Sequence, residues 1–344
     1  MRDRSSKARK EELGDSRTQT MWVSSITSQW SSMVRRARAD SLWERSRENF
    51  TSSAEVNQRV NALKTGEIDI AFDISGEGVQ QIRDDPNLNM VQNPGMGVNY
   101  IYFNMVNGPT ADIRVRKALQ MAVDREAMCK ALYQYDEGQP GWLALPPNSW
   151  GYDESLIDLV PKYDVEGAKA LLAEAGYPDG FTLEYYTGDS ATSKKIGEIF
   201  QQFAQAIGVT VKINQAAWGT FSEIGASGNA DVIAMSWTWY PDPYFYLNKM
   251  FHEESLGTLG NGQQFNIPEV NDLLDQAIAE SDQDARAVLY KEALKLITEQ
   301  YAQIDYAVSN VNVGMSNKVM DFPVRPDKTI EVADDKNNNT WIAK

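Results

Sequence analysis

Hydrophobic and polar positions alternate with helical and strand periods from about residue 51 onward. Residues 56–63 carry apolar side chains on one helical face and Gly66 ends that pattern, while the apolar run 68–72 predicts a strand. A second helix is expected over 77–84. The first part of the pattern therefore predicts two helices around one strand.

The next stretch contains two helices with clear start signals. Residues 100–103 form a strand-like run before a turn at 107–109, and Asp112 and Asp124 each stand directly before a helical apolar period. An aspartate at this place accepts a hydrogen bond from a free backbone N–H of the first turn, so we expect both to be N-caps. A loop rich in glycine and proline is expected over 137–163.

The most regular alternation begins at Asp164, which precedes another helical period. The expected elements are a helix over 164–176, strands at 181–186, 209–213 and 231–237, helices at 191–207 and 220–226, and two amphipathic helices around 270–278 and 289–297. Strands that alternate with helices at this spacing are typical of βαβ units. The fold class expected for the chain is therefore α/β.

Residues 1–50 have a different composition. They hold 11 Lys and Arg against 7 Asp and Glu, are rich in serine and arginine, and show no sustained period. We expect a basic leader that is poorly ordered or foreign to the rest of the chain. A functional basic arm or a transit peptide is the alternative, and Glu11, Glu12 and Asp15 argue against the transit peptide.

Charge and cysteine content exclude several kinds of partner. The chain of 344 residues has a net charge of -15, which disfavours nucleic acid and anionic membranes because both repel it. No apolar run approaches the ~20 residues of a membrane-spanning helix. Cys129 is the only cysteine, so no internal disulfide can form, and its place in a helical pattern indicates a buried structural thiol.

The search for catalytic chemistry is mostly negative. His252 is the only histidine, and we expect it at a loop surface rather than in catalysis. The sequence has no G-x-S-x-G elbow, no P-loop and no G-x-G-x-x-G after a strand. Adjacent carboxylates such as Asp334 and Asp335 are expected by chance in a chain with 48 acidic residues, and indicate solvated surface. We therefore expect no metal site, no cofactor and no enzyme.

Aromatic side chains gather in residues 237–246, directly after a predicted strand. Loops at strand ends are where α/β domains place ligand contacts, and aromatic rings give a large contact area with polar handles. The candidate ligand-binding residues are Trp237, Trp239, Tyr240, Asp242, Trp218, Tyr102 and Asn104. The alternative is that Trp237 fills the core and that residues 244–246 begin a buried helix.

Five pieces of the sequence follow one another as they do in a known family. In chain order they are residues 62–70, 115–127, 146–152, 168–178 and 240–243. The second piece, residues 115–127, reads VRKALQMAVDREA. Together they resemble the family 5 extracellular solute-binding proteins, the peptide, nickel and oligosaccharide binders of ABC importers. The resemblance covers roughly residues 55–310.

This resemblance implies a periplasmic binding protein-like fold of type II, in the peptide-binding class. Residues 99–305 would form one complete lobe, 51–98 a remnant of the other lobe, and 306–344 a return to that remnant. Family members are considerably longer and begin with a signal or lipoprotein signal. We therefore expect a chain that lacks its N-terminal part, with capture of solute compromised because the family closes two lobes on the ligand.

The resemblance also implies a function and its partners. The chain would be the solute-binding component of an ABC importer, periplasmic or extracellular, held at the membrane by a lipoprotein anchor in full-length members. It would capture a peptide or an oligosaccharide as a monomer and deliver it to the membrane permease subunits. The alternative is an acidic α/β hydrolase or transferase whose site the motif search missed.

One departure from the family concerns the ligand. Peptide binders of this family commonly carry an acidic residue just before the Tyr-Pro-Asp-Pro segment, and Trp239 stands there in this chain. An indole offers no negative charge to an ammonium, so the hypothesis is a neutral, hydroxylated ligand stacked on Trp237, Trp239 and Tyr240. In the alternative, Asp242 meets the amine of a peptide.

Overall fold

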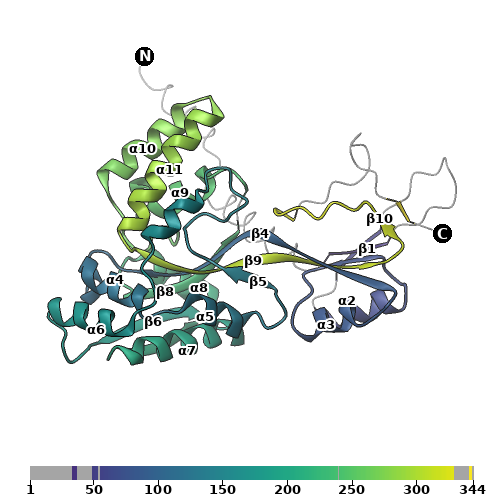
Figure 1. Ribbon diagram of the computed structural model, residues 1–344, viewed down its shortest axis with the longest axis horizontal. Coiled ribbons are helices and arrows are strands. Elements are labelled where there is room, and N and C mark those ends of the chain that lie inside the picture. Colours follow the sequence, from purple (N-terminus) through teal and green to yellow (C-terminus); the bar gives the residue numbers. More distant parts are fainter. Residues whose placement is uncertain (1–32, 37–48, 53–54, 239, 329–340, 343–344) are drawn as a thin grey trace, which may run out of the picture. The chain divides into compact units, whose positions relative to one another are not determined.

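The computed structural model describes residues 33–36, 49–52, 55–238, 240–328 and 341–342, with side chains for 55–238 and 240–328. The expected leader over residues 1–50 lies outside the described residues, apart from the backbone of β1 (Met33–Arg36) and the start of β2 (Asn49–Ser52). The other described residues form mixed α and β structure (Figure 1).

The chain divides into two compact units. Unit 1 comprises residues 1–91, 312–324 and 331–344, and unit 2 comprises 92–311 and 325–330. Two long strands, β4 (Leu88–Phe103) and β9 (Gln303–Ser316), contribute residues to both units. The chain therefore passes between the units within these two strands and again near residue 325.

Unit 1 is built on a small antiparallel sheet. Its strand order is β2, β1, β3 (Ile70–Phe72) and the end of β9, and β3 pairs with β9 through Ala71 and Gly314. Helices α2 (Val56–Lys64) and α3 (Glu77–Arg83) pack close together because Gly78 leaves no side chain between them. A short pair, β10 (Val319–Met320) and β11 (Trp341–Ile342), completes this unit.

The sheet of unit 2 has the order β9, β4, β8, β6, β7. Strand β6 (Thr182–Gly188) lies parallel to both β7 (Thr210–Ala216) and β8 (Val232–Thr238), and β4 lies antiparallel to β8. The short β5 (Gly138–Pro140) pairs with the outer side of β9. Because β6, β7 and β8 are mutually parallel, their carboxyl ends meet at one edge of the sheet.

Helices cover both faces of this sheet. One face carries α4 (Ile113–Met121), α5 (Arg125–Leu132), α6 (Val165–Glu174) and α7 (Ala191–Ala206), whose apolar residues pack on Ile101 and Phe103. The other carries α8 (Trp218–Ala226), α9 (Tyr244–Phe251), α10 (Pro268–Ala279), α11 (Gln283–Glu299) and the loop 141–160. Figure 1 shows α9, α10 and α11 together, away from α6 and α7.

Three short 3-10 helices, η2 (Pro109–Ala111), η3 (Glu154–Leu159) and η4 (Glu253–Ser255), lie in the connections of unit 2. Helix η3 and strand β5 both fall inside the stretch expected to be loop over 137–163. The expected N-caps are confirmed, since the side chains of Asp112 and Asp124 each accept a backbone N–H of the helix that follows. The side chain of Asp164, where a helix was expected to begin, caps α6 in the same way.

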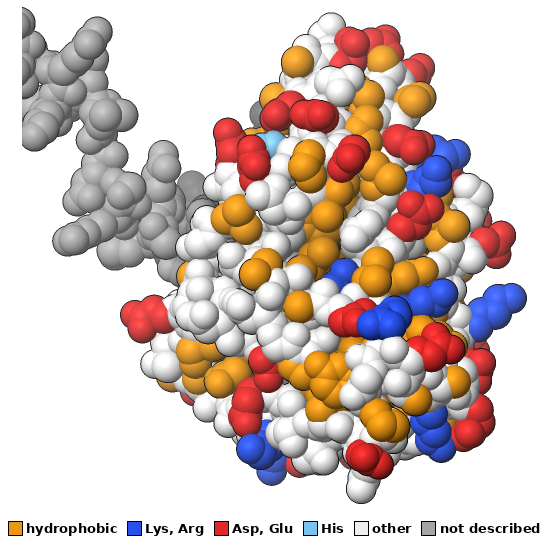
Figure 2. Space-filling model, turned by 90° about the vertical axis from the view of Figure 1, so that its left-hand side faces the viewer, with side chains coloured by type: hydrophobic (Ala, Val, Ile, Leu, Met, Phe, Trp, Pro, Cys, Tyr) orange, Lys and Arg blue, Asp and Glu red, His pale blue; other side chains and the backbone are white. Residues whose placement is uncertain are grey.

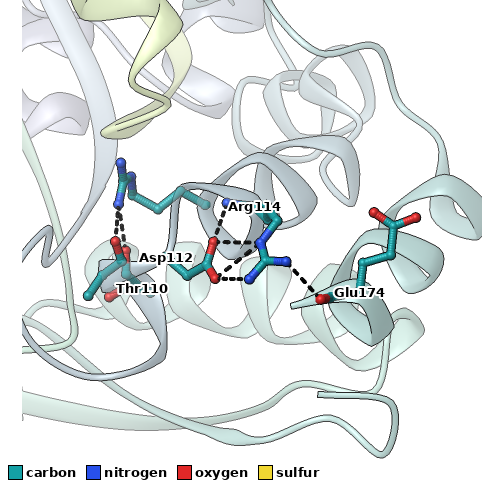
Figure 3. A network of polar contacts seen from close by, with 6 residues as sticks. Thr110, Asp112, Arg114 and Glu174 are labelled. Carbon is teal, nitrogen blue, oxygen red and sulfur yellow. Dashed lines mark hydrogen bonds and ion pairs between the residues drawn. The ribbon is translucent and has the colours of Figure 1, made fainter. Parts of the chain in front are cut away.

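A polar network fixes the start of α4 against the end of α6 (Figure 3). The carboxylate of Asp112 accepts from the backbone N–H of Arg114 at 2.8 Å and from its guanidinium group, which lowers the pKa of Asp112. Arg114 Nη1 also donates to the backbone oxygen of Glu174 at 2.8 Å. Arg116, which is buried, donates to the backbone oxygens of Thr110 and Ala111. These bonds satisfy carbonyl groups that would otherwise be free at helix and turn ends.

The distribution of acidic side chains and the burial of Cys129 agree with what the sequence predicted. On the face shown in Figure 2, Asp and Glu side chains are spread from top to bottom rather than gathered in one patch, as expected for solvated surface. Among the described helices, none is long and apolar enough to cross a membrane. Cys129 is buried as predicted, and burial raises its pKa to about 11.

Candidate ligand-binding site

The candidate site lies at the edge of unit 2 where β6, β7 and β8 end. Gly188, Ala216 and Thr238 are the last residues of these strands, and helices α7 and α8 begin close behind the first two. Gln215 Nε2 donates to the backbone oxygens of Gly188 and Ser190 at 3.1 and 3.0 Å, which ties two of the connections together. The edge thus combines strand ends with two helix starts.

Exposed aromatic rings occupy this edge. Trp218, the first residue of α8, is 63% exposed, and Tyr240, two residues after β8, is 58% exposed. Trp218 leans on Phe221 with ring centroids 6.0 Å apart, and Tyr240 meets Phe245 edge to face at 5.3 Å. Large exposed rings are uncommon on a soluble surface, and here two of them follow the parallel strands β7 and β8, which flank β6.

The remaining aromatic residues of segment 237–246 divide between surface and core. Trp237 is half-buried against the core formed with α9, α10 and α11. Trp239 lies outside the described residues. Helix α9 begins at Tyr244, as the alternative interpretation expected, and it buries Tyr246 while Phe245 stays 36% exposed.

An ion pair anchors the segment that carries Tyr240. Arg286 Nη2 of α11 lies 3.2 and 3.1 Å from the two carboxylate oxygens of Asp242. Asp242 Oδ1 also accepts the backbone N–H of Tyr244 at 3.0 Å, and Ser149 Oγ donates to the backbone oxygen of Pro241 at 2.9 Å. Asp242 is therefore a paired carboxylate within this segment.

Arg286 is itself held on several sides. Its Nε donates to the backbone oxygen of Ala277 in α10 at 3.0 Å, and its Nη2 donates to Tyr290 Oη at 3.3 Å. The guanidinium carbon lies 5.1 Å from the ring centre of Trp150 and 5.6 Å from that of Tyr290. Arg286, Trp150 and Tyr290 were not among the predicted site residues, because each looks like an ordinary helix or loop residue until the fold brings it to Asp242.

Tyr102 and Asn104 belong to the interior rather than to the exposed edge. Tyr102 is fully buried, its hydroxyl has no hydrogen-bond partner among the described residues, and burial raises its pKa. Asn104 is 1% exposed; it donates to the backbone oxygens of Gly228 and Ala230 and accepts the backbone N–H groups of Val106 and Asn107. The side chain of Asn104 thus stabilises the turn after β4, and neither residue is among the exposed residues of this edge.

The expectation for His252 is wrong. The side chain is buried at the end of α9, not exposed in a loop. Its Nδ1 accepts the backbone N–H of Glu254 at 3.2 Å, and its Nε2 lies 3.2 Å from Asp275 Oδ1 of α10. The polar residues that surround His252 in the sequence indicated a loop, whereas the imidazole caps the short helix η4 under α10.

A cleft of about 230 Å³ opens beside β5 on the same face of the sheet as α11. Its walls come from residues 139–142, 145, 147, 152, 154, 157 and 308, and they combine apolar side chains such as Trp142 and Ile157 with polar groups. Glu154 stands at the border of the cleft. This hollow is formed by the long loop that the sequence marked by its glycines and prolines.

A buried polar cluster lies deeper in unit 2. Asp305 of β9 is 5% exposed, and burial raises its pKa to about 7 despite the opposing effects of a hydrogen bond from Gln303 and the charge of Arg125. Arg125 donates to the backbone oxygen of Asp305 and to Gln120 Oε1, and lies 5.8 Å from the ring centre of Trp142. Within the part of the chain that the structure describes, no group of three or more His, Cys, Asp or Glu could hold a metal ion.

Comparison with known proteins identifies the family. The profile described as "Bacterial extracellular solute-binding proteins, family 5 Middle" matches residues 46–257. A dipeptide-binding protein of Escherichia coli K12 is 27% identical over 283 residues, which are 80% of this chain and 52% of that protein. The periplasmic murein peptide-binding protein MppA of the same organism is 32% identical over 256 residues, 71% of this chain and 47% of that protein.

A solved structure supports the same assignment of the fold. The structure of HbpA2 from Haemophilus parasuis superposes with a TM-score of 0.78 at 26% identity, covering 86% of this chain and 58% of that one. This confirms the expected α/β fold of periplasmic binding protein type. The chain spans about half the length of the curated relatives that it matches.

These relatives are binding proteins and not enzymes, in agreement with the negative search for catalytic motifs. The matching profile covers more than half of the chain. It includes all five pieces of sequence on which the resemblance rested, as well as β6, β7 and β8. The chain belongs to the bacterial extracellular solute-binding proteins of family 5.

Proposed function

We propose that this chain takes part in capturing a small solute outside the cytoplasm for delivery to the membrane subunits of an ABC importer. The observation that carries the proposal is the pair of exposed rings, Trp218 and Tyr240, at the carboxyl edge of β6, β7 and β8 in a member of a solute-binding family. Ligands of open α/β sheets bind at such edges. The part of the chain expected to form a complete lobe, 99–305, contains every residue of this edge.

A small peptide is the first candidate ligand. The relatives named above bind a dipeptide and a murein peptide, according to their names. At the edge of this chain a peptide would lay its apolar side chains and its neutral backbone against Trp218 and Tyr240. Its ammonium group would find Asp242 already paired with Arg286.

A neutral oligosaccharide is the second candidate. The observation that favours it is the combination of exposed rings with a paired carboxylate, because sugar rings stack their apolar faces on aromatic side chains and need no charged partner. Both candidates share the same surface, so one set of variants tests both.

The proposed partners and location follow from the family. The chain would act as a monomer at the outer side of the membrane, with a lipoprotein anchor where the full-length protein carries one, and would meet the permease subunits of an importer. These statements are proposals for the whole protein, of which the matched region is about half.

Isothermal titration of the full chain with trileucine and with cellotetraose tests the proposal. Trp218→Ala and Tyr240→Ala should each weaken binding of the preferred ligand about fivefold or more, because each removes an exposed ring worth about 1 kcal/mol of contact. Tyr163→Ala is the matched control, since Tyr163 is 52% exposed and packs on Phe203 of α7. Binding that is unchanged in both edge variants, or equally reduced in the control, would contradict the proposed site.

A further inference from the structure

The ion pair between Asp242 and Arg286 differs in construction from an ordinary surface pair. Both side chains are partly exposed, at 30% and 22%, so the pair lies at the surface of the edge. One guanidinium nitrogen faces both oxygens of Asp242, at 3.2 and 3.1 Å. Lys194 and Glu198 on α7, by contrast, are 57% and 49% exposed and make a single contact at 3.4 Å.

The guanidinium group of Arg286 has little freedom to leave. A hydrogen bond to Ala277 fixes Nε, and the rings of Trp150 and Tyr290 lie against the charged group at 5.1 and 5.6 Å. A planar cation held by aromatic faces and by a carbonyl keeps its geometry at low entropic cost. The guanidinium group is therefore held beside Asp242 by contacts from α10, α11 and the loop that carries Trp150.

The segment that Asp242 belongs to carries the exposed ring of Tyr240. Ser149 binds the backbone oxygen of Pro241, and the Asp242 carboxylate accepts the N–H of Tyr244, so these bonds fix the segment that follows Tyr240. Arg286 on α11 pairs with the carboxylate of the same segment, which lies more than 40 residues away in the sequence.

We propose that Arg286 is a specificity-determining positioning residue: it masks the carboxylate of Asp242, so that the edge presents aromatic rings without an accessible negative charge. This inference rests on the proposed function of the edge. A ligand ammonium would have to displace a guanidinium that is bound to both oxygens of Asp242, whereas a ligand without an ammonium loses nothing. The masked carboxylate therefore selects against recognition through a free amine.

Removing the guanidinium while keeping a long side chain tests the masking. In the full chain, Arg286→Met should uncover Asp242, and Arg286→Gln serves as a second variant that keeps a polar side chain if the first fails to fold. Coupling of glycinamide with a carbodiimide, followed by mass spectrometry, reports how accessible each carboxylate is. The rate at Asp242 should rise severalfold in the variant, while the rate at the exposed Asp179 stays the same.

Affinity measurements test the specificity. We expect the ratio of affinities for trileucine over N-acetyl-trileucine to rise about fivefold in Arg286→Met, because the uncovered carboxylate gains a charge-assisted contact with the free amine. Arg286→Met combined with Asp242→Asn should return the ratio to the wild-type value, since the new partner is gone. Arg286→Lys, which keeps the charge, should change the ratio less than Arg286→Met.

The outcomes separate the inference from the proposed function. An unchanged coupling rate at Asp242 in both Arg286→Met and Arg286→Gln would overturn the masking. A raised coupling rate with an unchanged affinity ratio would overturn the role in specificity. If the wild type binds neither peptide, the peptide candidate fails, and the coupling rates still decide whether Arg286 masks Asp242.

Discussion

The buried carboxylate of Asp305 should make the stability of unit 2 fall as the pH rises. Asp305 is 5% exposed and its folded pKa is raised to about 7, above its ordinary value near 4. The cavity that it lines has a volume of only about 20 Å³, enough for roughly one water molecule, so solvent cannot hydrate the charged form well.

The sign follows from the protons bound in each state. Between pH 4 and pH 7 the folded chain keeps the Asp305 proton while the unfolded chain releases it, so the free energy of unfolding falls as the pH rises through this window. Integrating the two titration curves from pH 5 to pH 8 gives a loss of about 2 to 3 kcal/mol. Asp305→Asn removes the titrating group, and with it this part of the pH dependence.

Urea denaturation followed by tryptophan fluorescence at pH 5, 6, 7 and 8 measures this effect. The difference in unfolding free energy between Asp305→Asn and the wild type should shift in favour of the variant by about 2 to 3 kcal/mol between pH 5 and pH 8. Asp179→Asn, at an exposed position, controls for the loss of one carboxylate. Parallel pH curves for wild type and Asp305→Asn would refute the reasoning.

Three further predictions concern the scaffold. Phe200→Ala, at a fully buried ring stacked on Tyr185 at 5.8 Å, should lower the unfolding free energy by about 3 to 5 kcal/mol in urea denaturation, and a loss below 1 kcal/mol would contradict tight packing there. The thiol of Cys129, buried and with its pKa raised to about 11, should react with a disulfide reagent at pH 8 only after urea is added, and rapid labelling of the native chain would show the burial to be wrong. Asp164→Ala should cost about 1 kcal/mol of stability through the lost cap of α6, with Asp164→Asn retaining most of it, and equal losses in the two variants would argue against capping.

Local signals accounted for most of the helices and parallel strands. The helical periods after Asp112, Asp124 and Asp164 became α4, α5 and α6, because a capping carboxylate and an apolar face act within a few residues. The strands predicted at 181–186 and 231–237 became β6 and β8 with shifts of one or two residues. Such features depend little on tertiary contacts.

Features that depend on distant partners were missed. Strand β4 begins at Leu88, whereas the sequence predicted a strand only near Tyr100. Pro94, Gly95 and Gly97 argue against a strand when the sequence is taken alone, but pairing with a neighbouring strand extends β4 through this stretch. His252 is buried because α10 covers it. In both cases the deciding contact lies far away in the sequence.

The candidate site shows the same division. Trp218 and the aromatic segment after β8 could be predicted as site residues from composition and from their places at strand ends. The structure leaves Trp218 and Tyr240 exposed. The pairing of Asp242 with Arg286 could not be predicted from the sequence, since the arginine looks like any polar residue on an amphipathic helix. Tyr102 lies within β4 and Asn104 directly follows it, and because β4 runs antiparallel to β8, both lie away from the carboxyl edge of β8.

Hydrogen–deuterium exchange on the full chain, with and without a saturating amount of whichever probe binds more tightly, tests the central claim most directly. If the carboxyl edge of β6, β7 and β8 binds the solute, ligand should slow exchange in residues 188–191, 216–219 and 240–245, and should leave α6 over Val165–Glu174 unchanged. Protection confined to other parts of unit 2, with these three connections unaffected at saturation, would contradict the account.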